Sequence, residues 1–157
     1  MASILDMAKE FTLQQVEMLL KDASYIPEEN LGWCAAGCGK TAAQILREIA
    51  RANWEIAAAI KGEAPGEAGE KRAKLIEEAS SLDALSQLVR ESAKAVCDAI
   101  DSHSEADLGN LIRMPWGAMF PLGQAIFLPT SHMTYHDGQI NYIQLLLGDS
   151  KFHWAEG

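Results

Sequence analysis

Residues 128–140 read LPTSHMTYHDGQI, and this stretch is expected to form part of the last long helix of the chain. It contains His132 and His136, four residues apart. Positions i and i+4 lie on one face of a helix, so the two imidazoles can converge on one metal ion. Two hydrogen-bonded core histidines would show the same spacing, and both interpretations stay open. Met133 stands where the metalloprotease motif H-E-x-x-H has glutamate, which excludes a zincin-type protease.

The rest of the chain predicts three more long amphipathic helices. Apolar residues recur at helical period, and no strand pattern of useful length is found. Ser3 and Thr41 are expected N-caps, and Pro129 is expected to kink the last helix. Together these signals predict an all-α four-helix bundle in a single domain, residues 1–157. The expected helices span residues 3–23, 42–61, 70–102 (with Ser80-Ser81 as the candidate break) and 122–147.

The composition excludes several classes of function. An apolar fraction of 48% and a charged fraction of 22% are typical of a soluble globular protein, and no apolar run approaches the roughly 20 residues that cross a bilayer. A net charge of -9 argues against nucleic-acid binding, which needs clustered Lys and Arg. Because no signal-peptide core is found, a cytoplasmic location and reduced thiols at Cys34, Cys38 and Cys97 are expected.

A third metal ligand is expected from a facing helix, and Glu48 is the best candidate. It lies beside the apolar stripe of the helix over 42–61, where an unpaired carboxylate would be destabilising. With His132 and His136 it would form a site of two imidazoles and one carboxylate, with positions open for water or substrate. The alternative is a partly exposed Glu48 that pairs with Arg47 or Arg51, and spacing alone does not separate the two.

Several motifs together resemble the DinB/YfiT-like superfamily. The most specific is the H-x-x-x-H-x-G-Q-I block, and the others are Leu31-Gly32-Trp33, residues 41–53, Met114-Pro115-Trp116-Gly117 and Leu146-Leu147-Gly148-Asp149. The resemblance implies an up-down-down-up bundle, usually a homodimer, with a divalent metal held by three histidines. His132 and His136 match two of these ligands. Glu48 stands in place of the third, which implies either a two-histidine, one-glutamate site or a site that is weak or lost.

Members of this superfamily include thiol-dependent S-transferases and isomerases that use bacillithiol or mycothiol. The resemblance therefore implies a metal-dependent enzyme with a small-molecule thiol as partner. The charge and the lack of a long apolar run add the expectation of no nucleic-acid or membrane partner. Nickel or zinc is the expected metal, with iron or manganese as alternatives. The alternative functions are a metal-dependent hydrolase and a non-catalytic, stress-related binding module. In the hydrolase, Glu48 would be the general base if it is not a ligand. The residues expected to line a substrate pocket are Trp33 (alternatively a plug over the core), Gln44, Asn53, Trp116 and Tyr135.

Overall fold

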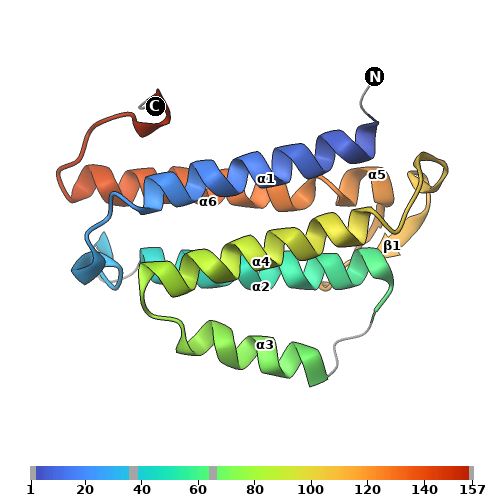
Figure 1. The fold of residues 1–157 in the computed structure, drawn as a ribbon, viewed down its shortest axis with the longest axis horizontal. Helices are drawn as coiled ribbons and strands as arrows, with labels where there is room; N and C mark the ends of the chain where they lie inside the picture. Colours follow the sequence, from blue (N-terminus) through green and yellow to red (C-terminus); the bar gives the residue numbers. More distant parts are fainter. Residues whose placement is uncertain (1–2, 36–38, 64–66, 156–157) are drawn as a thin grey trace.

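A computed structural model, which describes residues 3–35, 39–63 and 67–155, shows a bundle of four long helices (Figure 1). The helices α1 and α6 run in one direction, and α2 and α4 run in the other. The predicted all-α, up-down-down-up bundle is confirmed. No helix of the described segments is both long and apolar enough to cross a membrane. The long helices are α1 (Ile4–Ala23), α2 (Ala42–Lys61), α4 (Leu82–Ile100) and α6 (Leu128–Leu146).

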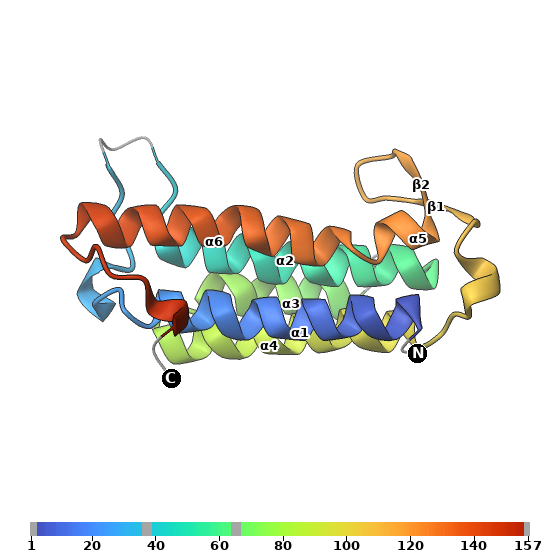
Figure 2. The same cartoon turned by 90° about the horizontal axis from the view of Figure 1, so that it is seen from above.

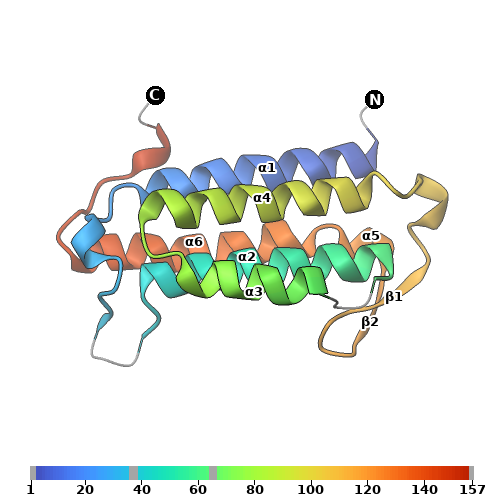
Figure 3. The ribbon, with the colours of Figure 1, turned by 60° about the horizontal axis from the view of Figure 1, so that its bottom comes forward.

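A fifth helix, α3 (Glu67–Glu78), returns the chain to the end of the bundle where α2 began, so that α4 can run parallel to α2 (Figure 3). The candidate break of the expected helix over 70–102 is confirmed, because α3 ends before Ser80-Ser81 and α4 begins directly after them. Ser81 caps the new helix, since its side chain accepts a hydrogen bond from the backbone N–H of Ala84. Arg47 of α2 holds the turn by donating to the Ala79 carbonyl at 2.6 and 3.1 Å.

The connection between α4 and α6 contains a β-hairpin that the sequence did not predict (Figure 2). Its strands, β1 (Leu111–Arg113) and β2 (Met119–Pro121), pair antiparallel. Strands of three residues are too short to show an alternating pattern. At the turn, Gly117 has φ 90°, a backbone conformation that glycine adopts without strain. The remaining short elements are η1 (Glu28–Asn30), η3 (Glu105–Asp107), α5 (Leu122–Ala125) and η4 (His153–Ala155).

The predicted kink at Pro129 is also wrong. The expected single helix over 122–147 is divided into α5 and α6, and Pro129 lies in the first turn of α6. A proline is well tolerated there, because the first N–H groups of a helix have no intrahelical acceptor. Pro129 therefore lies at the start of α6 and interrupts no hydrogen bond within it.

Two apolar clusters fill the bundle and fix the backbones of α2 and α6 relative to each other. Burial of each large side chain contributes about 1.5–3 kcal/mol, so these contacts dominate the packing. Trp33 packs against the first cluster, which agrees with the structural alternative for this residue. Buried members include Leu19, Leu46, Leu85 and Met133 in the first cluster, and Ile56, Ile100, Leu122 and Ile126 in the second.

The contact between α1 and α6 is partly polar. Asp22 of α1 and Asp137 of α6 are both almost fully buried. Asn141 donates to Asp22 at 2.8 Å and to Asp137 at 3.3 Å, and Gln15 donates to Asp137 at 2.9 Å. Trp154, from the C-terminal segment, donates its indole N–H to Asp22 at 2.6 Å. These five residues are called the Asp22–Asp137 network below.

Thr41 forms a capping box at the start of α2, as Ser3 caps α1, so both predicted N-caps are confirmed. Thr41→Ala is expected to lower the free energy of unfolding by about 1 kcal/mol, because the Gln44 N–H loses its acceptor. Denaturant unfolding would measure the loss. Thr134→Ala, the same change on the exposed face of α6, should alter stability by less than about 0.5 kcal/mol. Equal losses in the two variants would contradict the capping role.

Candidate metal centre

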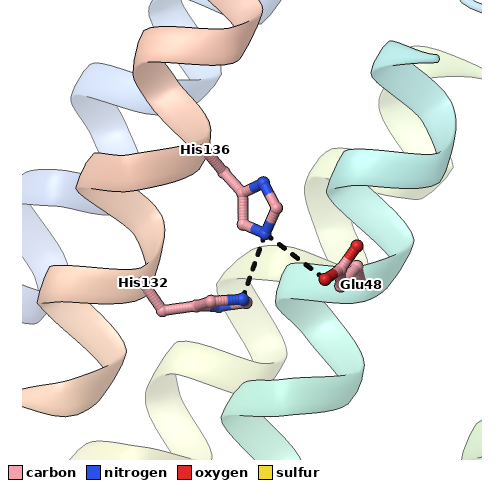
Figure 4. Close-up of side chains that lie close together, drawn as sticks. All are labelled: Glu48, His132 and His136. Carbon is pink, nitrogen blue, oxygen red and sulfur yellow. Dashed lines mark hydrogen bonds and ion pairs between the residues drawn. The ribbon is translucent and has the colours of Figure 1, made fainter. Parts of the chain in front are cut away.

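Glu48 of α2 faces His132 and His136 of α6, which project from adjacent helical turns (Figure 4). The two histidine Nε2 atoms are 3.0 Å apart, and His136 Nε2 is 3.6 Å from Glu48 Oε1. One ligand atom from each residue lies within 4.8 Å of the other two. The structure thus brings together the three residues that the sequence analysis selected as candidate ligands.

The donor set and its spacing fit a divalent first-row metal ion. Bonds of about 2.0–2.2 Å place neighbouring ligand atoms about 3.0–3.5 Å apart around one ion. The separations of 3.0 and 3.6 Å are close to that requirement. Two imidazoles and one carboxylate form a nitrogen and oxygen donor set that zinc, nickel, iron and manganese all accept.

The ring of His136 is held in one orientation by its neighbours on α6. Gln139 donates through its amide nitrogen to the Tyr135 hydroxyl at 3.3 Å, so its amide oxygen faces His136 Nδ1 at 2.7 Å. Nδ1 therefore carries a hydrogen, and Nε2, which faces Glu48 and His132, is the ring nitrogen left to bind a metal. A hydrogen bond of this kind on the second ring nitrogen is usual for histidines that bind metals.

His132 is neutral at physiological pH. Burial lowers the pKa of this ring, and the neighbouring His136 lowers it further. The neutral ring is the form that binds a metal. Its Nδ1 is buried and has no hydrogen-bond partner in the described part of the chain, so His132 is held less firmly than His136.

The carboxylate of Glu48 is shared between the two histidines and a cation. Lys40 Nζ contacts Glu48 Oε2, which leaves Oε1 directed toward His136. Burial raises the pKa of Glu48, but the Lys40 ammonium and the two imidazoles oppose this, and the pKa lies below its ordinary value. Glu48 is therefore ionised, as a metal ligand must be.

The expected alternative pairing of Glu48 with Arg47 or Arg51 is not observed. Arg47 donates to the Ala79 carbonyl, and Arg51 pairs with Glu77 of α3 at 2.5 Å. The sequence did not predict Lys40 as the partner of Glu48. Lys40 precedes α2, and helical spacing relates only residues within one helix. Gln139 was missed as a partner of His136, although its i+3 spacing was a usable signal.

A cavity of about 480 Å³ opens beside Glu48 and His132 and would admit a small molecule. Apolar side chains from α2, α6 and the hairpin turn form much of its wall, and Arg51 and Glu55 add one charge of each sign. Besides the two candidate ligands, the lining consists of Arg51, Ala52, Glu55, Ile56, Trp116, Leu128 and Ser131.

Of the residues predicted to bind substrate, Trp116 lines this cavity, and Tyr135 lies beside His136 with ring centroids 5.2 Å apart. The structure does not bring the other three to it. Gln44 belongs to the capping box of α2, and Trp33 packs against the first apolar cluster. Asn53 is fully buried and donates to Ser92 at 3.3 Å, which is a structural role.

The cysteines do not contribute to the centre as far as the structure describes them. Cys34 and Cys97 are free thiols, and neither belongs to the cluster of candidate ligands. Burial raises the pKa of Cys97, so this thiol is in its neutral, unreactive form. Cys38 lies outside the described residues.

Solved structures with a similar fold include two kinds of protein. A DinB-like protein from Bacillus cereus ATCC 10987 superposes with a TM-score of 0.67 and 20% identity, over 87% of this chain and 91% of that chain. A mycothiol-dependent maleylpyruvate isomerase gives 0.64 and 15%, over 93% of this chain and 70% of that chain, and a histidine-to-alanine variant of it gives the same values. At these identities the likeness shows the fold alone. No curated protein matches the sequence.

The sequence also matches a family described as the DinB superfamily, over residues 10–140. The matched region contains Glu48, His132 and His136 and covers most of the chain. This protein therefore belongs to the DinB superfamily.

Proposed function

We propose that this protein is a divalent-metal-dependent enzyme that uses a low-molecular-weight thiol in an S-transfer or isomerisation reaction. The observation that carries the proposal is the convergence of His132 Nε2, His136 Nε2 and Glu48 Oε1 beside a cavity of about 480 Å³. Membership of the DinB superfamily supports it, as does the similarity in fold to an isomerase that depends on mycothiol.

A divalent ion held by these residues would lower the pKa of a thiol that reaches an open position, which favours the nucleophilic thiolate. The protein contributes orientation and shape. Gln139 fixes the ring of His136, and Lys40 fixes one oxygen of Glu48. Trp116 and Leu128 line the cavity and would bind the apolar part of a substrate while excluding water from that wall.

Nickel or zinc is the metal that we expect. Iron and manganese are alternatives, because a site of nitrogen and oxygen ligands accepts several divalent ions and the ion bound depends on which is available. A homodimer in the cytoplasm is also part of the proposal. The dimer rests on the family resemblance and would be tested by sedimentation of the purified protein, and the location rests on the absence of a signal-peptide core.

Elemental analysis of untagged protein purified without chelator is expected to give about one equivalent of metal per chain, since one set of three ligands binds one ion. Electrophilic substrates would then be screened with and without mycothiol or bacillithiol. Turnover that needs both metal and thiol would support the proposal. Turnover without thiol would favour the hydrolase, and no metal after reconstitution would favour the non-catalytic binding module.

A further inference from the structure

Lys40 is the only cation other than histidine that contacts Glu48 among the residues that the structure describes. It lies directly before the N-cap Thr41, whose capping box fixes the backbone at this point. From there its side chain extends along α2 to Glu48 Oε2. The position of the ammonium is thus set by the start of the same helix that carries the candidate ligand.

The ion pair with Lys40 gives the two oxygens of Glu48 different partners. Oε2 accepts from Lys40, while Oε1 faces His136 Nε2 at 3.6 Å. A carboxylate free of other partners can bind a metal through both oxygens. With Oε2 held by the ammonium, Glu48 can offer one oxygen, and the coordination position that the second would occupy stays open.

The contact also changes the charge of the centre. The imidazoles of His132 and His136 are neutral as ligands, so Glu48 carries the only negative charge among the three. A positive charge on the outer oxygen of Glu48 offsets that negative charge. More of the charge of a bound dication then remains available to a thiol or another anionic group at the open position.

Stability alone is a poor reason for this ion pair. Lys40 and Glu48 are half-exposed, with side-chain exposures of 50% and 37%, and exposed ion pairs contribute little to folding. Two other cations of α2 lie near Glu48 in the sequence. Arg47 connects α2 with the turn after α3, and Arg51 connects α2 with α3 itself. Lys40 differs from them because its partner is a candidate metal ligand.

We propose that Lys40 is a positioning residue of the metal centre, which holds Glu48 as a one-oxygen ligand and keeps a coordination position open for substrate. This inference rests on the proposed function, because it requires that Glu48, His132 and His136 bind a metal. It predicts a change in coordination and in metal preference when Lys40 is replaced, beyond any change in turnover.

The test uses the full chain loaded with Co²⁺, whose visible absorption weakens as its coordination number rises. Lys40→Met is expected to absorb more weakly than the wild type, because both Glu48 oxygens can then bind. Its affinity for Mn²⁺ relative to Zn²⁺ should rise about 10-fold, the lower limit of effects typical of groups that contact metal ligands. Manganese favours more oxygen ligands than zinc does, which gives the direction of the change.

Two variants serve as controls. Lys40→Arg keeps a cation beside the same oxygen and should retain the spectrum and metal preference of the wild type. Lys94→Met removes an exposed ion pair with Asp98 on α4 and should also behave as the wild type. Thermal unfolding of all variants would show that the metal-free fold is retained.

The outcomes separate the two proposals. If the wild type binds metal and Lys40→Met has the same spectrum and metal preference, the role of Lys40 is wrong and the metal centre stands. If the wild type binds neither Co²⁺, Mn²⁺ nor Zn²⁺, both proposals are wrong.

Discussion

Replacing His132 and His136 together by alanine is expected to abolish stoichiometric binding of divalent metal. The double variant removes both nitrogen donors and leaves Glu48, a single half-exposed carboxylate that already pairs with Lys40. The affinity for the metal should fall by more than about 100-fold. Losing a residue that only hydrogen-bonds to a ligand already costs up to about 100-fold, and here two ligands are lost. Elemental analysis and calorimetric titration with Zn²⁺ and Ni²⁺ would measure the loss.

A histidine outside the centre provides the matched control. His103 lies after α4 and bonds to the Ile60 carbonyl at 2.9 Å, so His103→Ala should leave metal binding unchanged. Because His136 is 1% exposed, its replacement also affects stability, and circular dichroism must show that the double variant is folded. Retention of one equivalent of metal in a folded double variant would contradict the site.

The stability of the protein is expected to contain a contribution from Asp137 that decreases between about pH 4 and pH 7. Burial first, and then the neighbouring carboxylate of Asp22, raise the pKa of Asp137 to about 7. In the unfolded chain the pKa returns to about 3.9. Between these values the folded state binds more protons than the unfolded state. The contribution is therefore fully present below about pH 4 and is lost as the pH rises to about 7.

Urea unfolding of Asp137→Asn and wild-type protein at several pH values between 5 and 8 would isolate this contribution. The difference between the two unfolding free energies should change with a slope approaching about 1.4 kcal/mol per pH unit below pH 7 and become flat above it. Glu10→Gln, which replaces an exposed carboxylate on α1, would serve as the matched control. A pH-independent difference for Asp137→Asn would mean that Asp137 is ionised throughout this range.

Periodicity and capping patterns were sufficient to predict the long helices of the bundle, because each buries an apolar stripe and two begin at recognisable N-caps, Ser3 and Thr41. They were insufficient for the hairpin, where three-residue strands leave no period to detect. The kink predicted at Pro129 was wrong because the sequence did not show where α6 begins. A proline bends a helix from its interior but is accommodated in the first turn.

In the candidate site too, features of single helices were predictable and contacts between elements were not. The i, i+4 spacing of His132 and His136 and the inward position of Glu48 are properties of single helices, and the structure brings these residues together. Partners that depend on packing between elements were not predictable from spacing. Lys40 pairs with Glu48 in place of the alternative partners Arg47 and Arg51. Asn53, predicted to bind substrate, is buried and donates to Ser92.

The Asp22–Asp137 network also determines how α1 and α6 can be aligned along their axes. A slide of α6 by one helical turn, about 5.4 Å, would move Asp137 and Asn141 away from Gln15 and Asp22 and leave several buried polar groups unpaired. Interfaces made only of leucine, isoleucine and alanine discriminate much less between such alignments, because apolar contacts have no direction. Since α6 also carries His132 and His136, the alignment that these polar residues select sets the height of both imidazoles relative to α1, and the apolar cluster that packs α6 against α2 places them opposite Glu48.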